Sequence, residues 1–347
     1  MVIREVLPDL VKLRSLPRES AEAIFGAIME GKAEPLEIAA LLALIQARGA
    51  TVEEVVSAAR AMRRHLVPVE TPVGLRVMDT CGTGGTGSRV FNISTSAAIV
   101  VAAAGRPRGL AVAKHGNRAV TSASGSSDVL QELGVALPMP EGSLPKAMDE
   151  AGVCFCFAPA HHPGMKHAGP IRAALGIRTI FNLLGPLTNP AGARHQLLGV
   201  GDEATQDLMV RALEQLGAER AWVVTTELPD GRRLGELTPF APISVAKLEG
   251  GVIESMTVDP AGLGLAGDDP SSIVVANPAE SAAMIRAVFD GEAGSARDTV
   301  LLNAAAALVV GEVVGSLEEG VVMAAEALDS GAARLTLAKL ADLSRAG

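Results

Sequence analysis

The stretch Gly82-Thr-Gly-Gly-Thr-Gly87 constrains the fold more than any other part of the sequence. An apolar run ending at Met78 precedes it and predicts a strand, and an alanine-rich run from Ser94 to Ala104 follows it and predicts a helix. A strand, a glycine loop and a helix N-terminus together form a phosphate cradle, because unpaired N–H groups and the helix dipole both face the anion. The stretch therefore predicts an α/β fold that holds an anionic ligand at this loop.

The charge of the surrounding segment supports an anionic ligand. Residues 80 to 127, between Asp79 and Asp128, contain five Lys or Arg residues and no acidic residue, which is a formal charge of +5. The whole chain carries a formal charge of −9. Such a local inversion of charge is typical of a site that attracts an anion.

Three other interpretations of the loop fit the sequence less well. The loop satisfies the dinucleotide pattern G-x-G-x-x-G, but no acidic residue that could hold a ribose lies between the loop and Asp128. This argues against a site for NAD. The Gly-Lys-Ser/Thr of a Walker loop is also absent. A glycine-rich turn without a ligand is the third, and the hydroxyls of Ser94 and Thr95 and the downstream Lys114 disfavour it.

The first 68 residues read as a small all-helical lobe. Apolar residues recur at helical spacing in three segments, which open near Pro17, Pro35 and Thr51. Thr51-Val-Glu-Glu54 matches a capping box at the start of the third segment.

Residues 69–347 alternate strand and helix patterns and predict a larger α/β domain. We expect a mostly parallel central sheet flanked by helices, and we expect residues from about 165 to 190 to pack back on the helical lobe. Pro68 and Pro72 mark the linker between the two parts.

Composition excludes several classes of partner. The negative net charge and an aromatic content of 2%, with no Tyr, argue against nucleic acid as a partner. No apolar run approaches the roughly 20 residues that span a bilayer, and the N-terminus shows no signal-peptide pattern. The three cysteines form no C-x-x-C pair, which suits a reducing compartment, so we expect a cytoplasmic protein without a membrane partner.

Neither the histidines nor the cysteines predict chemistry of their own. His161, His162 and His167 lie close together in sequence, but no Cys or acidic residue stands at zinc-ligand spacing. Cys81 borders the glycine loop without an identifiable base, so a small buried residue is the favoured interpretation.

The chain resembles the anthranilate phosphoribosyltransferases, within the nucleoside phosphorylase/phosphoribosyltransferase fold family. The resemblance covers nearly the whole chain and rests on the glycine loop and on Phe91-Asn-Ile-Ser-Thr95, Lys114-His-Gly-Asn-Arg118, Ser124-Gly-Ser-Ser-Asp128 and Asn182-Leu-Leu-Gly-Pro-Leu-Thr-Asn-Pro190. It implies transfer of the phosphoribosyl group of phosphoribosyl pyrophosphate (PRPP) to the amine of anthranilate, the second step of tryptophan synthesis. It also implies Mg²⁺ as cofactor, a homodimer joined through the helical lobe and a site between the lobes.

The resemblance also implies roles for individual residues. PRPP would be bound by Gly82, Gly85, Thr86, Asn92, Ile93, Ser94, Thr95, Lys114, His115, Gly116, Asn117, Arg118, Ser122 and Ser126. Gly82, Asn117 and Arg172 would contact anthranilate, with the Arg172 guanidinium suited to its carboxylate. Lys114 and Asn117 would be the catalytic residues, and Ser94 and Glu236 the metal ligands.

The sequence departs from the family pattern at four places. Thr86 and Gly235 stand where the family has Asp, Val90 replaces a Thr, and Arg106-Pro-Arg-Gly109 is an insertion. Because the family's Asp-Glu pair holds magnesium, Gly235-Glu236 predicts weaker metal binding here. Reduced activity or another acceptor is therefore an alternative, as are a pyrimidine nucleoside phosphorylase and a non-enzymatic relative that binds nucleic acid.

Overall fold

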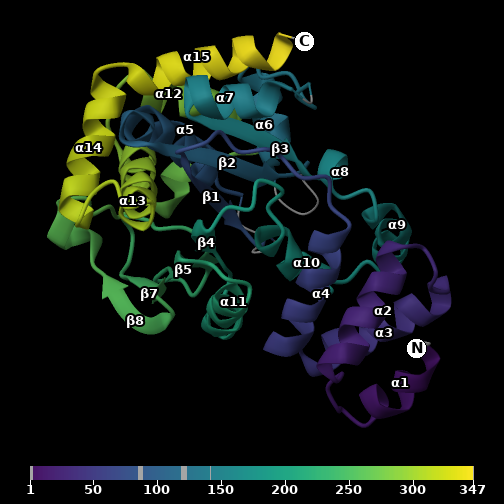
Figure 1. The fold of residues 1–347 in the computed structure, drawn as a ribbon. Coiled ribbons are helices and arrows are strands. Elements are labelled where there is room, and N and C mark those ends of the chain that lie inside the picture. The colour runs from purple at the N-terminus through teal and green to yellow at the C-terminus, as the bar shows by residue number, and fades with distance from the viewer. Residues whose placement is uncertain (1–2, 85–88, 119–122, 141, 347) are drawn as a thin grey trace.

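The molecule consists of a small helical lobe set against a larger α/β domain (Figure 1). The computed structural model describes residues 3–84, 89–118, 123–140 and 142–346. The arrangement confirms the predicted fold class of a helical lobe joined to a domain with a mostly parallel sheet.

Four helices open the chain and form the core of the helical lobe. Their bounds are Ile3–Val11 (α1), Arg18–Met29 (α2), Pro35–Arg48 (α3) and Val52–Arg64 (α4). The predicted capping box is confirmed, since the Thr51 hydroxyl accepts from the Glu54 amide and the Glu54 carboxylate accepts from the Thr51 amide. Local sequence signals therefore place the start of α4 correctly.

A later segment of the chain completes this lobe. Helices Met165–Leu175 (α9) and Phe181–Leu184 (α10) pack against α2, α3 and α4. The Phe181 ring meets the Phe25 ring edge-on with 6.0 Å between centroids, and the His167 ring lies against the backbone of Gly31. The α9–α10 segment therefore packs with the helical lobe, although it follows the first three strands of the α/β domain in sequence.

One eight-stranded sheet forms the centre of the α/β domain. Its strand order is β3-β2-β1-β4-β5-β7-β8, with β6 paired to β5. The bounds are Arg76–Gly82 (β1), Leu110–Gly116 (β2), Val153–Phe157 (β3), His195–Gly199 (β4), Arg220–Glu227 (β5), Arg233–Leu234 (β6), Ile243–Glu249 (β7) and Val252–Val258 (β8). Strands β1 to β5 pair in parallel, whereas β6, β7 and β8 are antiparallel additions that the sequence patterns did not predict.

Helices cover the sheet as in other α/β domains. Ile93–Gly105 (α5) packs on β1 and β2, and Glu203–Gln215 (α11) packs on β5 and β7. The remaining helices are Ser126–Glu132 (α6), Ser143–Ala151 (α7), Ala158–His161 (α8), Pro278–Phe289 (α12), Ser295–Val310 (α13), Leu317–Asp329 (α14) and Ala332–Arg345 (α15). Helix α13 also contacts α5, so the alanine-rich α5 is buried between strands and helices. Among the helices of the described residues, none has the length and apolarity required to cross a membrane.

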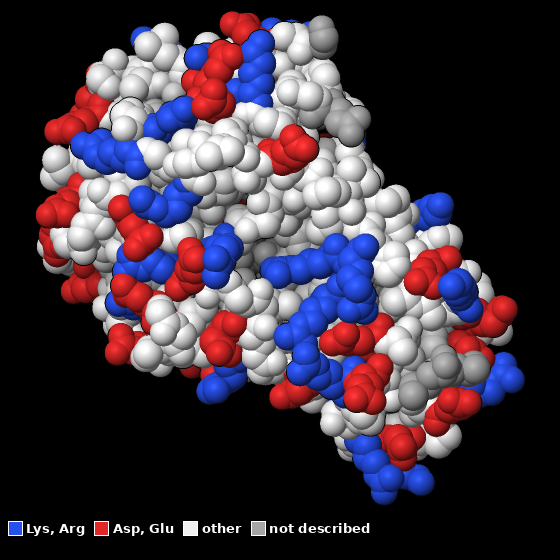
Figure 2. Space-filling model, viewed as in Figure 1, with Lys and Arg blue, Asp and Glu red and all other residues white. Residues whose placement is uncertain are grey.

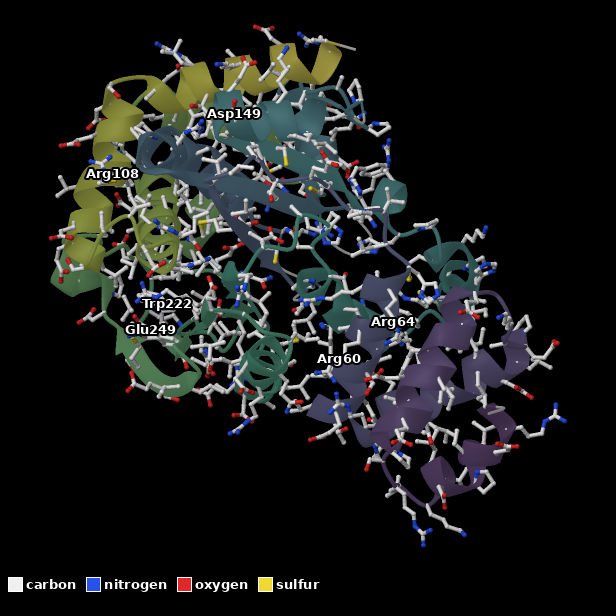
Figure 3. The ribbon with its side chains drawn as sticks, in the orientation of Figure 1. Arg60, Arg64, Arg108, Asp149, Trp222 and Glu249 are labelled. Atoms are coloured by element: carbon white, nitrogen blue, oxygen red, sulfur yellow. The ribbon has the colours of Figure 1, made fainter. Side chains whose placement is uncertain are left out.

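Arginines of α4 connect the two lobes. Figure 2 shows Lys and Arg side chains gathered over this part of the molecule, and Figure 3 places Arg60 and Arg64 on α4. Arg60 donates to the carbonyl of Gln215 at 3.1 Å, and Arg63 donates to those of Leu187 and Leu216 at 2.7 and 3.2 Å. Gln215 and Leu216 end α11, so both cations lie at the negative end of a helix dipole.

Candidate active site

The carboxyl ends of the central strands meet at one edge of the sheet. The chain runs from β1 outward to β3 and then returns to the other side of β1 as β4, so the strand order reverses at β1. Strands β1, β2 and β4 end there at Gly82, Gly116 and Gly199. Open α/β sheets bind ligands at such a switch point, and the two cavities described below lie at this place.

The first cavity, which we call the phosphate cavity, measures about 400 Å³ and contains the N-terminus of α5. Most of its described lining residues are glycines or small polar residues. The lining residues are Cys81, Gly82, Thr83, Gly84, Val90, Phe91, Asn92, Ile93, Ser94, Lys114, His115, Gly116, Asn117, Arg118, Ser124, Gly125, Ser126, Arg178, Asn182, Gly199, Leu234, Gly235 and Glu236. The structure thus brings three separate sequence motifs to one helix N-terminus.

Most of the residues predicted to bind PRPP line this cavity. They are Gly82, Asn92, Ile93, Ser94, Lys114, His115, Gly116, Asn117, Arg118 and Ser126. Thr95 does not line it; its hydroxyl is buried and has no hydrogen-bond partner among the described residues. Gly85, Thr86 and Ser122 lie outside the described residues.

Lys114 is buried at the wall of the phosphate cavity. Its ammonium donates to the Thr80 carbonyl and, at 3.1 Å, to the Ser94 hydroxyl. Burial lowers the pKa of Lys114, and the nearby Asp79 and Glu236 carboxyls oppose that shift. The side chain therefore joins strand β2 to the first turn of α5 and also compensates buried carboxyls.

Glu236 is half-buried, lines the same cavity and accepts a hydrogen bond from the backbone of Ser94. Burial raises the pKa of Glu236 to about 8, whereas the Lys114 charge and a hydrogen bond from the backbone of Ser94 act in the other direction. Glu236 and Ser94, the two predicted metal ligands, are thus brought to one cavity.

Ser94 and Glu236 would supply only part of the coordination shell of a metal ion. Across the described residues, no group of three His, Cys, Asp or Glu side chains is placed to hold a metal ion. Hard divalent cations accept such oxygen ligands and take the rest of their shell from water or phosphate. The residues present therefore fit a magnesium ion that shares its ligands with a bound phosphate compound.

Gly235 explains why no second carboxylate stands beside Glu236. A Cβ atom at Gly235 would lie 2.9 Å from the Val200 nitrogen and 3.0 Å from the Gly199 carbonyl carbon. A Cβ atom at Gly199 would lie 1.6 Å from the Gly235 oxygen. The two glycines let the end of β4 and the β6 connection touch backbone to backbone, so this arrangement has no room for an Asp at position 235.

A buried aspartate aligns the strand that carries Lys114. Asp79 accepts from the His115 amide at 3.2 Å and from the Asn189 side-chain amide at 2.8 Å. The same Asn189 nitrogen donates to the Ala113 carbonyl at 2.7 Å. Burial raises the pKa of Asp79, and the Lys114 charge opposes that effect. Asp79 therefore connects β1, β2 and the Asn182–Pro190 motif beneath the site.

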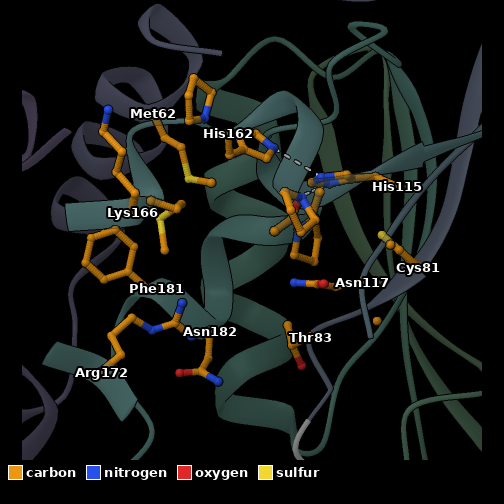
Figure 4. A pocket seen from close by; sticks show the side chains of 18 residues that line it. Met62, Cys81, Thr83, His115, Asn117, His162, Lys166, Arg172, Phe181 and Asn182 are labelled. Atoms are coloured by element: carbon orange, nitrogen blue, oxygen red, sulfur yellow. Dashed lines mark hydrogen bonds between the residues drawn. The ribbon is translucent and has the colours of Figure 1, made fainter. Parts of the chain in front are cut away.

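The second cavity adjoins the first and lies between the two lobes (Figure 4). We call it the Arg172 cavity; it measures about 660 Å³. Its lining comprises Met62, Cys81, Gly82, Thr83, His115, Gly116, Asn117, Ala158, Pro159, His162, Pro163, Met165, Lys166, Arg172, Phe181, Asn182, Gly185 and Pro186. All three residues predicted to contact anthranilate, Gly82, Asn117 and Arg172, are among them.

Besides Lys166, Arg172 is a cation that helix α9 contributes to this cavity. Its guanidinium lies over the Phe181 ring, 5.5 Å from the centroid, which orients the planar group. Burial lowers the pKa of Arg172, but a guanidinium stays charged at neutral pH. The surrounding walls of Met62, Pro163 and Pro186 are apolar, so the cavity suits a flat apolar ring that bears one anionic group.

A pair of neutral histidines forms another wall (Figure 4). The Nε2 atoms of His115 and His162 are 3.1 Å apart, and Nδ1 of His115 lies 2.9 Å from the Gly185 carbonyl. Because a carbonyl only accepts, Nδ1 of His115 carries the proton and its Nε2 accepts from His162. Burial lowers the pKa of both residues, that of His162 to about 3, so the wall adds no charge opposite Arg172.

The other histidines and Cys81 have structural positions. His161 contacts the linker through the Val67 carbonyl at 3.0 Å. Cys81 is buried, as predicted, and its sulfur accepts from Gln196 at 3.1 Å. Burial raises the pKa of the Cys81 thiol well above its ordinary value, and the Asp79 charge adds to this, so the thiol form persists.

Sequence reasoning missed several lining residues. Met62 and His162 carry no pattern that separates them from core residues, and the Asp79–Asn189 contact joins residues 110 positions apart. Arg178 could have been predicted as a lining residue, because it is a second arginine six positions after Arg172, in the loop that follows Gly176. It lies outside every motif on which the resemblance rests.

Comparison with known proteins agrees with this geometry. Residues 4–66 match a family model described as "Glycosyl transferase family, helical bundle domain", and residues 74–334 match "Glycosyl transferase family, a/b domain". An anthranilate phosphoribosyltransferase of Caulobacter vibrioides is 47% identical over 97% of this chain and 96% of its own length.

Two solved structures are also similar. That of anthranilate phosphoribosyltransferase from Thermus thermophilus has a TM-score of 0.88 and 39% identity, covering 98% of this chain and 99% of its own. That of the Saccharomyces cerevisiae enzyme in complex with PRPP and Mg has a TM-score of 0.87 and 26% identity, covering 99% and 97%. Both similarities extend over the helical lobe and the α/β domain together.

Proposed function

The chain belongs to this glycosyl transferase family, and we propose that it transfers the phosphoribosyl group of PRPP to the amine of anthranilate. One observation carries the proposal: the phosphate cavity and the Arg172 cavity open into each other and share Gly82, Asn117 and Asn182. A donor in the first cavity and an acceptor in the second therefore meet at these shared residues. The products are N-(5-phosphoribosyl)anthranilate and pyrophosphate.

The phosphate cavity binds the donor. The N-terminal amides of α5 and the Ser94 and Ser126 hydroxyls donate to phosphate oxygens, and Lys114 supplies positive charge from the wall. Breaking the bond from C1 to pyrophosphate leaves positive charge on the ribose and negative charge on the leaving group. Fixed donors around the leaving group stabilise that separation.

The Arg172 cavity orients the acceptor. Arg172 pairs with the carboxylate of anthranilate, and the apolar walls hold the ring so that its amine points toward Asn117. The neutral amine forms the bond to C1 and then releases one proton to solvent. A strong base is not required, which suits the low pKa of His162.

The proposal includes a magnesium ion at the donor site. Ser94 and Glu236 would hold the ion, as their placement in one cavity supports. When bound, Mg²⁺ supplies positive charge to the pyrophosphate oxygens.

The proposal includes a cytoplasmic homodimer joined through the helical lobe. Large apolar side chains are exposed there, with Leu36 at 85%, Leu13 at 68% and Val11 at 65%. Such residues suit an interface with a second copy. Sedimentation of the wild type and of Leu36→Glu tests this, with a shift toward monomer expected in the variant.

The activity is tested with purified protein, PRPP, magnesium and anthranilate. Anthranilate fluorescence should disappear only when all components are present. Thymidine with phosphate serves as the control substrate, and phosphorolysis of thymidine without consumption of anthranilate would contradict the proposal. Aniline should be a poor acceptor, because it lacks the carboxylate that Arg172 would bind.

A further inference from the structure

Arg178 is the cation that the helical lobe presents to the phosphate cavity. The α/β domain contributes every other described lining residue of that cavity except Asn182. Both residues come from the α9–α10 segment, and these helices pack on α2, α3 and α4. An arginine from one lobe thus stands at a cavity that the other lobe builds.

The backbone on both sides of Arg178 is held in place. Helix α9 ends at Leu175, and its C-cap Gly176 has a φ of +64°, which ends the helix before Arg178. The Thr179 amide donates to the Asn182 side chain at 2.9 Å, and the side chains of Thr179 and Ile180 are buried. Arg178 itself is exposed and lines the phosphate cavity, and these neighbours set the position of its backbone.

We propose that Arg178 binds the pyrophosphate group of the donor and thereby ties donor binding to the position of the helical lobe. A guanidinium matches phosphate oxygens with two parallel N–H groups, so it suits this ligand better than a point charge does. The inference rests on the proposed function for the identity of the donor. The phosphate chemistry of the cavity supports it independently, because the N-terminus of α5 and the described part of the glycine loop, residues 82–84, line the same space.

The proposed contact between Arg178 and pyrophosphate links the two cavities. Arg178 lines the phosphate cavity, Arg172 lines the Arg172 cavity, and Asn182 lines both, all within one short segment of the helical lobe. Pyrophosphate bound to Arg178 restrains this segment and so favours the arrangement that receives the acceptor. Reciprocity then requires that acceptor and pyrophosphate increase each other's affinity.

Calorimetry with magnesium pyrophosphate, PRPP and anthranilate tests the proposal. Arg178→Ala should weaken pyrophosphate and PRPP by about 10-fold or more, because a charge-assisted hydrogen bond is lost. Arg178→Lys should recover part of this affinity. Arg211→Ala is the matched control, since Arg211 is exposed on α11, pairs with Asp207 and lines neither cavity. In the wild type, pyrophosphate should tighten anthranilate binding, and Arg178→Ala should abolish that effect.

The outcomes separate the two proposals. Unchanged pyrophosphate affinity in a folded Arg178→Ala protein overturns the role of Arg178, even if the transferase reaction proceeds. Wild-type protein that binds pyrophosphate through Arg178 but never consumes anthranilate overturns the proposed acceptor and leaves the role of Arg178 supported. Arg172→Ala should weaken the binding of anthranilate and leave pyrophosphate affinity unchanged. If Arg172→Ala and Arg178→Ala lost pyrophosphate affinity equally, the α9–α10 segment would be generally disturbed, and the specific role of Arg178 would be overturned.

Discussion

At the scale of single residues, the phosphate cavity combines a buried lysine with a carboxyl that resists ionisation. Lys114 and Glu236 face the same turn of α5, and burial favours the neutral form of each. A bound phosphate favours the charged form of Lys114, and a bound cation favours the ionised form of Glu236. We therefore expect ligand binding at this residue pair to depend on pH.

The pH dependence of magnesium binding follows from Glu236. Its pKa is about 8, so the carboxyl is mostly protonated at pH 7 and mostly ionised at pH 9. A metal ligand must lose its proton, so the affinity of the PRPP-bound enzyme for magnesium should rise about tenfold between these pH values. Magnesium titrations at pH 7, 8 and 9 measure this rise. Glu236→Gln should flatten the dependence, and a wild type with no dependence would show that Glu236 does not hold the ion.

A second prediction concerns the contact between Gly235 and Gly199. Gly235→Ala should lower the free energy of unfolding by ~1–3 kcal/mol, because its Cβ meets the backbone at 2.9 Å and overpacking has that cost. Gly235→Asp should be destabilised at least as much and should not lower the magnesium requirement.

Urea unfolding measures both Gly235 variants against Gly262→Ala, whose added Cβ would meet no atom within 4 Å. We expect the control to change stability by less than ~0.5 kcal/mol. A stable Gly235→Asp protein with tighter magnesium binding would contradict the steric argument.

At the scale of elements, helix α4 depends on one buried carboxylate. Glu54 caps the helix and also accepts from the Leu16 amide at 2.8 Å, and it forms a buried ion pair with Arg48. A single side chain thus ties the start of α4 to the end of α3 and to the segment before α2. The capping box therefore marks the start of α4 and also makes tertiary contacts.

Glu54→Gln should destabilise the protein strongly. The amide keeps one acceptor oxygen and turns donors toward Arg48 and Thr51, and breaking a buried ion pair costs ~3–5 kcal/mol. Glu53→Gln, an exposed change on the same helix, should cost less than ~0.5 kcal/mol. Thermal unfolding followed by circular dichroism compares the two. Equal melting temperatures would show that the Glu54 network contributes little.

At the scale of the whole molecule, the Arg172 cavity is built by both lobes together. The Arg172 cavity takes Met62, Arg172 and Phe181 from the helical lobe and Gly82 and Asn117 from the sheet. Arginines of α4 bind the C-terminal end of α11, as the contacts of Arg60 with Gln215 and of Arg63 with Leu216 show. We therefore expect contacts between the lobes to influence the shape of the Arg172 cavity.

Arg63→Met should loosen this contact. It removes the donors to the Leu187 and Leu216 carbonyls, which should cost about 1–2 kcal/mol of stability, a value reduced by the partial exposure of the side chain. Hydrogen exchange should accelerate near residues 187 and 216, and the KM for anthranilate should rise more than the KM for PRPP. Arg64→Met is the control, since Arg64 pairs with Glu22 inside the helical lobe. Identical exchange in both variants would contradict a role between the lobes.

Much of the architecture was predictable because it is set by local sequence. The caps and apolar spacing of α2, α3 and α4, the strand patterns of β1 to β5 and the glycine loop each lie within one short stretch. Helix capping and side-chain periodicity act over a few residues, so they can be read without knowing the neighbours. Strands β7 and β8 were not predicted because polar residues interrupt their apolar pattern, such as Lys247 in β7 and Glu254 in the edge strand β8.

By itself the sequence therefore determined the fold class, the phosphate-binding loop and the motifs that line it. Only the tertiary structure decided which distant groups meet there: Asp79 with Asn189, His115 with His162, Gly199 with Gly235, and Arg178 with the phosphate cavity. The physical reason is that these contacts depend on strand order and on how the α9–α10 segment returns to the helical lobe. Both depend on how the whole chain buries its apolar surface, which no single stretch of the sequence determines.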